Sequence, residues 1–388
     1  MEKVRVKGKY YFGHPWIYSK KIVETGDARP GDSVLVYTTR GRFVGSALFN
    51  PGSTLALRIY SRSYVEFDYP FIKERIFRAN EYRASIYPDA NSYRVVFGES
   101  DYLPGLIVDR YANGLVFQIL SLGVERKKKE VINALIDIFD PEFIYEKNDS
   151  LKRRDEGLEP VKRLVYGVLE GPVEIEENGI KYLVDIENGQ KTGFFLDQRE
   201  NREIVRRYAR GVESALDLFS YTGGFTLNLL KAGVKRVFAV DRSSTAISLL
   251  EENVRLNGFD SSRVITFKKE VDEFLNEMLF AGEKFDLVVV DPPAFTHKRR
   301  SRENAIRGYV ALHEGVLRVL KKGGTVFTFS CSQYIGEEEL LESFYQAAKN
   351  SGREFFIVEK LIQAKDHPVL LGFPESFYLK GFVLKEVN

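Results

Sequence analysis

The single cysteine of the chain, Cys331, stands where a buried strand is expected to end, in the segment Ser330-Cys-Ser332. A lone cysteine is most often a small buried apolar residue. At a strand end, however, the backbone amides of a strand-to-helix connection lie close by and favour the ionised thiol, the form that attacks carbon. Cys331 is therefore our first candidate for a catalytic nucleophile.

A carboxylate has a similar position in the segment Asp291-Pro-Pro-Ala-Phe295, directly after an apolar run. Pro292 and Pro293 fix φ and lack backbone donors, so they hold the Asp291 carboxylate rigidly at the strand tip. Phe295 offers a face on which a planar base can stack. An acid beside an aromatic ring is the minimal pocket for a nucleobase turned out of its stack, although a rigid turn with a buried phenylalanine also fits this segment.

A thiol and a carboxylate at neighbouring strand ends suit methyl transfer to carbon. Cytosine C5 is too electron-poor to attack a sulfonium methyl group, but addition of a thiolate at C6 makes C5 nucleophilic. Cys331 would form this adduct, and Asp291 would hydrogen-bond the N3/N4 edge of the base. A further group must remove the C5 proton, and His297, His313 and His367 are the candidates. A lone histidine is more often structural, so we assign this role to none of them.

A second set of residues, in the segment 215–225, suggests a cofactor. A short apolar run containing Asp217 meets a turn of Ser, Tyr, Thr and paired glycines, and helical spacing follows. Gly223 lets the backbone approach a ligand closely. The turn is not G-x-G-x-x-G, and Asp217 would repel a pyrophosphate, so a cationic cofactor such as S-adenosylmethionine fits better. The next strand ends on Asp241, where a carboxylate takes ribose hydroxyls. A strand-turn-helix unit without any ligand is the alternative.

The candidate residues of these segments can form one site only if their strands belong to the same sheet, with the strand ends side by side. β-rich runs alternate with helical segments through the second half of the chain, near Ala215, Arg236, Val264, Asp286, Thr325 and Phe377. This pattern predicts an α/β, doubly wound, Rossmann-like sheet, in which ligands bind at the carboxyl ends of the strands. After the third run, Glu270 or less favourably Asp272 would accept from an adenine amine. The segment 189–199 has the composition of a ligand-facing loop, and 197–201 is expected to cap the next helix.

The beginning of the chain differs from this pattern. Residues 1–65 contain eleven Lys and Arg against four Asp and Glu, although the formal net charge of the whole chain is only +2. Short strands are predicted at 33–37, 43–49 and 55–60, separated by Pro/Gly turns, and they would close into a compact barrel. The basic surplus favours a polyanionic partner. The alternative is that the aromatics and glycines only fold the barrel.

Between these regions the pattern is mixed α+β. Helices are predicted at 71–84 and 127–139, and hairpin strands at 106–109 and 115–120. Another hairpin is expected at 174–184. We therefore predict three domains, 1–68, 69–171 and 172–388. Two basic clusters of the middle domain are either RNA contacts or solvated faces, namely 126–129 and 152–154.

Composition narrows the class of protein further. One cysteine excludes an internal disulfide framework, and with four histidines it provides no ligand pair at zinc spacing, so no metal site is expected. No apolar run approaches the length of a membrane span, and no signal-peptide pattern opens the chain. A cytoplasmic protein is the prediction.

Taken together, the motifs resemble the ribosomal RNA large-subunit methyltransferase I family, and the resemblance covers nearly the whole chain. It is carried by the segments 189–199, 217–225, 291–295, 330–332 and 366–382. Gly13-His-Pro-Trp-Ile-Tyr18, 30–34 and 45–50 are similar to a PUA domain, an RNA-binding pseudo-barrel. Two features depart from the family: Glu270 stands where Asp is commoner, and the loop 296–302 is more basic.

The resemblance implies an S-adenosylmethionine-dependent enzyme that makes 5-methylcytosine in large-subunit ribosomal RNA, with Cys331 as nucleophile and Asp291 assisting. The partner would be ribosomal RNA or a ribosomal assembly intermediate, and a homodimer is allowed. We expect substrate contacts at Pro292, Pro293, Phe295 and Lys298. The resemblance places the cofactor contacts at Gln198, Asp217, Phe219, Tyr221, Thr222, Gly223, Asp241, Arg242, Glu270 and Asp291.

Three other functions remain open at this level. An amino or ring-nitrogen methyltransferase would use Asp291 and its prolines without needing Cys331. A non-catalytic scaffold would bind RNA and lack cofactor affinity. A small-molecule methyltransferase would use the cofactor half but leave residues 1–65 without a role, and its substrate affinity would not depend on salt.

Overall fold

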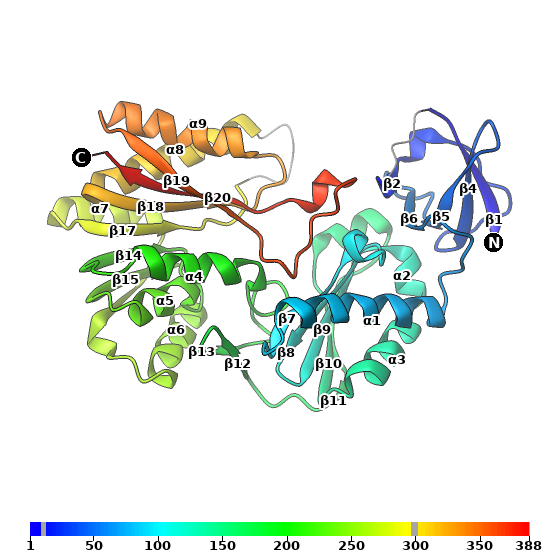
Figure 1. Cartoon of the computed structure of the whole chain (residues 1–388), viewed down its shortest axis with the longest axis horizontal. Helices are drawn as coiled ribbons and strands as arrows, with labels where there is room; N and C mark the ends of the chain where they lie inside the picture. Colours follow the sequence, from blue (N-terminus) through cyan, green and yellow to red (C-terminus); the bar gives the residue numbers. More distant parts are fainter. Residues whose placement is uncertain (9–12, 296–301, 388) are drawn as a thin grey trace. The chain divides into compact units, whose positions relative to one another are not determined.

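The structure of the chain is a computed structural model that describes residues 1–8, 13–295 and 302–387. His297 and Lys298 therefore lie outside the described residues. The chain forms two compact units, each built from several segments (Figure 1). The first comprises Met1–Glu176, Val184–Leu196 and Lys365–Ser376, and the second comprises Glu177–Leu183, Asp197–Ala364 and Phe377–Asn388. The three-domain division of the sequence stays a prediction.

The first unit begins with a six-stranded sheet. Its strands, in the order β2-β6-β5-β4-β1-β3 across the sheet, are β1 (Glu2–Val6), β2 (Trp16–Ile17), β3 (Ile22–Glu24), β4 (Ser33–Thr38), β5 (Phe43–Phe49) and β6 (Leu57–Ser61). The sequence predicted β4, β5 and β6. Alternate residues of β1 and β4 are buried in one core, including Val4, Val6, Val34 and Val36, so the other face of these strands points outward.

A five-stranded sheet with helices follows in the same unit. Its elements are α1 (Tyr69–Ile86), β7 (Ser92–Phe97), β8 (Leu106–Tyr111), β9 (Gly114–Ile119), α2 (Leu122–Arg126), α3 (Lys128–Phe139), β10 (Phe143–Asn148) and β11 (Val161–Gly167), with strand order β11-β10-β9-β8-β7. The predicted helices and hairpin are confirmed. Helix α1 starts where the Asp68 carboxylate accepts from the Phe71 amide at 3.1 Å, with Pro70 in the first turn.

The predicted hairpin at 174–184 is formed by β12 (Val173–Glu177) and β13 (Ile180–Val184). Its turn is Asn178-Gly179, and both residues have positive φ, 51° and 73°. Asn and Gly tolerate this conformation best, which explains why this dipeptide marks the turn in the sequence.

The second unit is the predicted doubly wound domain. Its elements are α4 (Arg199–Tyr208), β14 (Ser214–Leu218), α5 (Gly224–Lys231), β15 (Arg236–Asp241), α6 (Ser244–Leu256), β16 (Val264–Lys268), α7 (Val271–Ala281), β17 (Phe285–Val290), α8 (Arg302–Val319), β18 (Leu320–Ser330), α9 (Glu337–Asn350), β19 (Phe355–Ile362) and β20 (Lys380–Glu386). The strand order is β16-β15-β14-β17-β18-β20-β19. All neighbours are parallel except β20, which is antiparallel to β18 and β19.

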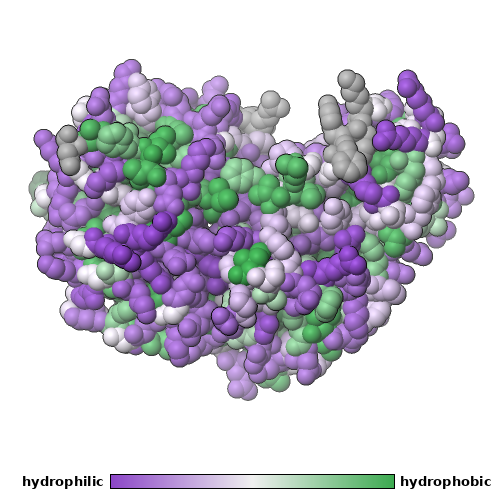
Figure 2. Space-filling view, in the orientation of Figure 1, coloured by the Kyte–Doolittle hydropathy of each residue, from purple (hydrophilic) through white to green (hydrophobic). Residues whose placement is uncertain are grey.

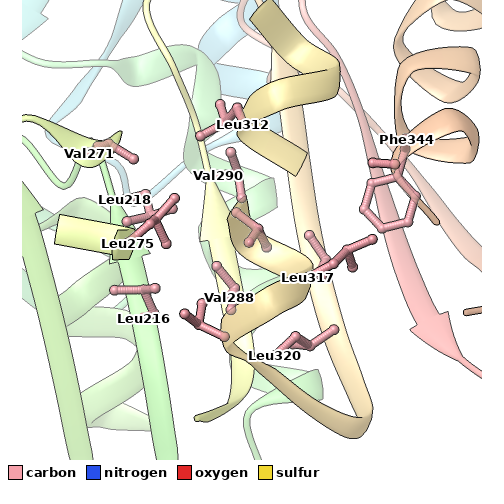
Figure 3. Close-up of a cluster of buried hydrophobic side chains, with 14 of the residues drawn as sticks. Leu216, Leu218, Val271, Leu275, Val288, Val290, Leu312, Leu317, Leu320 and Phe344 are labelled. Atoms are coloured by element: carbon pink, nitrogen blue, oxygen red, sulfur yellow. The ribbon is translucent and has the colours of Figure 1, made fainter. Parts of the chain in front are cut away.

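Helices cover both faces of this sheet, with α4, α5 and α6 on one side and α7, α8 and α9 on the other (Figure 1). Figure 3 shows the second layer, where side chains of β14 and β17 meet those of the helices. Leu216, Leu218, Val288 and Val290 are fully buried, as expected for strands covered on both faces. Hydrophilic residues occupy most of the molecular face shown in Figure 2.

Two local predictions need correction. The last strand, expected near Phe377, begins at Lys380, and β19 was not predicted. Asp197 does not cap α4: the N-cap residue is Gln198, which makes no side-chain capping bond, and Asp197 Oδ2 instead accepts from the Tyr378 hydroxyl at 2.5 Å. Asp197 lies in the short 3-10 turn 196–198, one residue before the N-cap position.

Candidate active site

The predicted site residues of the second unit follow the carboxyl ends of its parallel strands. Glu270 comes two residues after β16, Asp241 ends β15, the turn 219–223 follows β14, and Asp291 and Cys331 directly follow β17 and β18. Because these strands are neighbours in the order β16-β15-β14-β17-β18, the residues form a row along one edge of the sheet.

Asp291 is held by a chain of amide side chains. Gln198 Nε2 donates to Asp291 Oδ2 at 2.9 Å, and Gln198 Oε1 accepts from Asn201 Nδ2 at 2.6 Å. Asn201 also donates to the Ile362 carbonyl at 3.0 Å, which fixes the orientation of both amides. Burial, and secondarily the charge of Asp197, raises the pKa of Asp291 to about 7, against the opposing bond from Gln198. Near neutral pH this carboxyl group can therefore both give and take a proton.

Asp217 is buried, with 1% of its surface exposed, and is the last but one residue of β14, just before the turn. Its Oδ2 accepts from the backbone amide and the hydroxyl of Thr226, at 2.9 and 2.6 Å. Within the described part of the chain its Oδ1 has no hydrogen-bond partner, and neither have Ser220 Oγ and Thr222 Oγ1. Burial raises the pKa of Asp217 to about 7. Three buried polar atoms without partners at one turn are what a polar ligand needs.

The turn itself has a tightly constrained backbone. Phe219, Tyr221 and Gly223 all have positive φ, 63°, 47° and 90°. Such a conformation costs about 1 kcal/mol or more at a non-glycine residue and is often found at ligand sites. A Cβ atom at Gly223 would lie 2.7 Å from Leu227 Cδ1 and 2.8 Å from Leu250 Cγ. Gly223 is thus needed for internal packing.

Asp241 ties two of these turns together. Its Oδ2 accepts from the Tyr221 amide at 3.0 Å and its Oδ1 from the Ser243 amide at 2.8 Å. The neighbouring Arg242 is exposed, as is Glu270, which is the N-cap residue of α7 but makes no capping bond there. Both exposed side chains stand at the β15–β16 end of the row.

Cys331 is partly exposed at the other end of the row. Phe295 is 37% exposed and packs on Tyr309 with ring centroids 4.6 Å apart, while Pro292 is buried and Pro293 exposed. Burial, with smaller contributions from the charges of Cys331 and Asp291, raises the pKa of Tyr309 well above its usual range. Tyr309 on α8 is therefore in electrostatic range of both predicted catalytic residues, and no motif in the sequence indicated it.

Lys380 is a second residue that the sequence interpretation missed. It is buried, it stands opposite Ser330 in the register of β18 and β20, and its Nζ donates to the Ser332 carbonyl at 2.7 Å. The only signal was its position in the segment 378–382, which contributes to the family resemblance.

The two described histidine candidates both interact with side chains outside the row. His313 is buried, it hydrogen-bonds Thr328 Oγ1 at 2.9 Å, and burial lowers its pKa to about 3. His367 belongs to the first unit, where its Nδ1 lies 2.7 Å from Asp366 Oδ1. Among the residues with described side chains, no group of three or more His, Cys, Asp or Glu is arranged to hold a metal ion.

Comparison with known proteins decides the family. A model of S-adenosylmethionine-dependent methyltransferases matches residues 160–372. The curated Ribosomal RNA large subunit methyltransferase I of Pseudoalteromonas translucida is 39% identical over 377 residues, which cover 96% of this chain and 95% of that protein. The enzyme of the same name from Erwinia tasmaniensis is 37% identical over 379 residues, 96% of both chains. The chain belongs to the ribosomal RNA large subunit methyltransferase I family.

Membership of the ribosomal RNA large subunit methyltransferase I family confirms the predicted fold class and the cofactor, S-adenosylmethionine. A PUA-like domain model matches residues 3–62, which confirms the prediction for the first sheet. A putative methyltransferase complexed with SAH, SMU.776, has the same fold: it is 20% identical, with a TM-score of 0.86 over 99% of this chain and 100% of its own.

In the described residues, no helix combines the length and the apolar character that crossing a membrane requires.

Proposed function

We propose that this protein transfers a methyl group from S-adenosylmethionine to C5 of a cytosine in large-subunit ribosomal RNA, through a covalent adduct at Cys331. The observation that carries the proposal is the placement of Cys331 and Asp291 directly after the adjacent parallel strands β18 and β17, with Tyr309 in electrostatic range of both. The names of the curated relatives support ribosomal RNA as the substrate, and the cytoplasm, where ribosomes are assembled, as its location.

The cofactor fits the turn after β14. Asp217 Oδ1, Ser220 Oγ and Thr222 Oγ1 are buried polar atoms that lack partners among the described residues, and they suit the donors and acceptors of a nucleoside and an amino acid. The remaining lone pairs of Asp241 suit ribose hydroxyls. We assign the cofactor to this turn, with Phe219, Tyr221, Gly223, Arg242 and Glu270 around it and Gln198 and Asp291 at its substrate side.

The proposed reaction uses both sides of the row. The Cys331 thiolate attacks cytosine C6, the double bond moves from C5–C6 to C4–C5, and N3 takes a proton from Asp291. Bound S-adenosylmethionine supplies the methyl group that C5 takes. A base then removes the C5 proton, the S–C6 bond breaks with its electrons returning to sulfur, and the N3 proton returns to Asp291. Phe295 and the two prolines before it would hold the base.

Binding of S-adenosylmethionine should depend on pH through Asp217. Because burial raises the pKa of Asp217 to about 7, its carboxylate is mostly protonated below that value and ionised above it. The cofactor is a sulfonium cation, so we expect its affinity to increase as pH rises from about 6 to about 8. Asp217→Asn should weaken binding about tenfold or more and flatten this dependence, since a bond to a charged group is lost. Calorimetric titration of S-adenosylmethionine into the cofactor-free full chain at several pH values measures both effects.

S-adenosylhomocysteine is the matched control for this titration, because it has the same nucleoside and amino acid but no sulfonium charge. Its affinity should change less with pH than that of S-adenosylmethionine. Equal pH dependence for both ligands would contradict the assignment of Asp217 to the positive end of the cofactor.

The outer face of the six-stranded sheet supports RNA as the partner. Tyr64 is 62% exposed and stacks on Phe43, with ring centroids 4.1 Å apart and planes at 10°, and its hydroxyl is 3.0 Å from that of Tyr37. Lys3 Nζ lies 5.8 Å from the centre of the Tyr37 ring, and Arg5 is opposite Tyr37 in the register of β1 and β4. Exposed aromatic rings among cations provide a surface for unpaired bases.

Removing the exposed ring should therefore weaken RNA binding. We expect Tyr64→Ala to lower the affinity for a single-stranded oligonucleotide about tenfold, the effect of one lost stacked base. Lys3→Ala should instead reduce the salt dependence of binding. Fluorescence anisotropy over a series of KCl concentrations measures both quantities. Tyr345→Ala, which removes an equally exposed ring from α9, is the control, and a Tyr64→Ala affinity no lower than that of this control would exclude the surface.

A further inference from the structure

Lys380 is a buried cation beside the proposed nucleophile. Only 4% of its surface is exposed, and it is the first residue of β20. The antiparallel register places it opposite Ser330, so its side chain starts next to the end of β18, where Cys331 follows. Its Nζ donates to the carbonyl of Ser332 at 2.7 Å, on the far side of Cys331 in the chain. Lys380 is therefore bonded to the backbone that carries the sulfur.

The bond to Ser332 does not satisfy the charge of Lys380. Among the described side chains no carboxylate lies within ion-pair distance of its ammonium group, and a buried charge without a counter-ion is strongly unfavourable. Another buried lysine, Lys147 in the first unit, shows a purely structural alternative: its Nζ donates to two carbonyls, Ile186 at 2.5 Å and Gly189 at 2.6 Å. Lys380 donates to one such carbonyl, so other N–H groups of its ammonium can donate to an anion.

The charged groups around Lys380 point to the identity of that anion. Burial lowers the pKa of Lys380, and negative charge on Cys331 is the largest influence that raises it again, ahead of Glu339 and Glu337 on α9. Tyr309, which is also in electrostatic range of Cys331, and Asp291 contribute no positive charge. Of these groups, the Cys331 thiolate has the strongest electrostatic interaction with Lys380.

We propose that Lys380 is the positioning residue of Cys331, whose ammonium group, fixed by the Ser332 carbonyl, serves as the counter-cation of the thiolate. Its role rests on the proposed function. When the thiolate attacks cytosine C6, a sulfur electron pair becomes the S–C6 bond and the sulfur loses its charge. When that bond breaks, the electrons return to sulfur and the thiolate forms again beside Lys380. The lysine keeps its proton throughout, so the step needs no other reagent.

Alkylation of the thiol tests this proposal without any methyl transfer. Because Cys331 is the only cysteine, the rate of iodoacetamide labelling of the intact protein, followed by mass spectrometry from pH 5 to 10, reports its ionisation alone. Lys380→Gln keeps a donor for the Ser332 carbonyl but removes the charge, whereas Lys380→Arg keeps the charge. We expect the midpoint of the labelling profile to rise by about one pH unit or more in Lys380→Gln, which is about tenfold slower labelling at pH 7, and to be largely restored in Lys380→Arg.

Two comparisons distinguish an effect of the Lys380 charge on Cys331 from a general effect on the folded structure. Lys147→Met removes the other buried lysine and should lower the thermal stability while leaving the labelling midpoint unchanged. If folded Lys380→Gln has the wild-type midpoint, Lys380 is a structural residue and the proposal is wrong. Should Lys380→Gln fail to fold, Lys380→Arg provides the test through a midpoint within about half a pH unit of wild type, and a larger shift counts against the proposal.

Failure of this proposal can be distinguished from failure of the proposed function. The labelling profile requires neither RNA nor S-adenosylmethionine, so it reports on Lys380 even if the methylated atom is not C5. Conversely, a protein that methylates C5 through Cys331 but shows no midpoint shift in Lys380→Gln keeps its proposed function and loses only this inference.

Discussion

Cys331→Ala should transfer no measurable methyl group to cytosine C5. Without a thiolate the C5 carbon stays electron-poor, so the loss should be about 10⁴-fold or more in kcat, the range observed when a covalent nucleophile is removed. The affinity for S-adenosylmethionine should be unchanged, because Cys331 follows β18, two strands along the sheet from the turn after β14. Incorporation of labelled methyl groups into large-subunit ribosomal RNA, followed by nucleoside mapping, measures the effect.

The outcome of this experiment also discriminates between the possible chemistries. In the wild-type protein, RNA containing 5-fluorocytidine should form a stable covalent complex, because fluorine at C5 blocks the final elimination. Full turnover by Cys331→Ala would eliminate the thiolate route and leave an amino or ring-nitrogen methyltransferase that uses Asp291. Absence of cofactor binding by the wild-type protein would favour a non-catalytic scaffold.

Asp291→Asn should have the second largest effect. An amide accepts the hydrogen bond from Gln198 as the carboxylate does, but it cannot deliver a proton to cytosine N3. We expect kcat to fall about 10²- to 10⁴-fold, the usual contribution of a general acid. Asp286→Asn is the matched control, because Asp286 lies in β17, the strand that Asp291 follows, but pairs with Lys321 at 2.9 Å. Activity of Asp291→Asn equal to that of this control would exclude Asp291 as the acid.

The pH dependence of the wild-type enzyme follows from the same residue. The pKa of Asp291 is raised to about 7, so the protonated acid decreases as pH increases through 7. We expect kcat to decline on that alkaline side, and the decline should disappear from the residual activity of Asp291→Asn. The same sign applies to folding: a carboxyl group whose pKa is raised in the folded state favours that state when protonated, so this contribution to stability is lost as pH rises through about 7.

Much of the fold could be predicted because its central strands have a strong signal. Buried on both faces, β14 and β17 appear in the sequence as nearly continuous apolar runs. β19 also begins with an apolar run, but Phe356, Ile357 and Val358 are exposed at the sheet edge, so its sequence shows no alternation of apolar and polar residues to mark a half-buried strand. The two-residue strand β2 is too short for any period to be visible.

The sequence could predict only those site residues that lie at or directly after the ends of the parallel strands. Parallel strands bring their carboxyl ends to one edge, which is why Asp217, Asp241, Asp291 and Cys331 could be placed in one row from the sequence. Lys380 reaches the same edge through an antiparallel register. Pairing between segments so distant in sequence leaves no local pattern, and the same holds for the helix rotation that directs Tyr309 towards the site.

The position of β20 has a consequence for how the protein is made. This strand follows β19 along the chain but is inserted between β18 and β19 in the sheet. During translation β19 emerges from the ribosome with no neighbour to pair with, and residues 380–386 must thread in afterwards. A nascent chain that stops before Lys380 would thus lack both the strand that joins β18 to β19 and the lysine that we propose as the partner of Cys331.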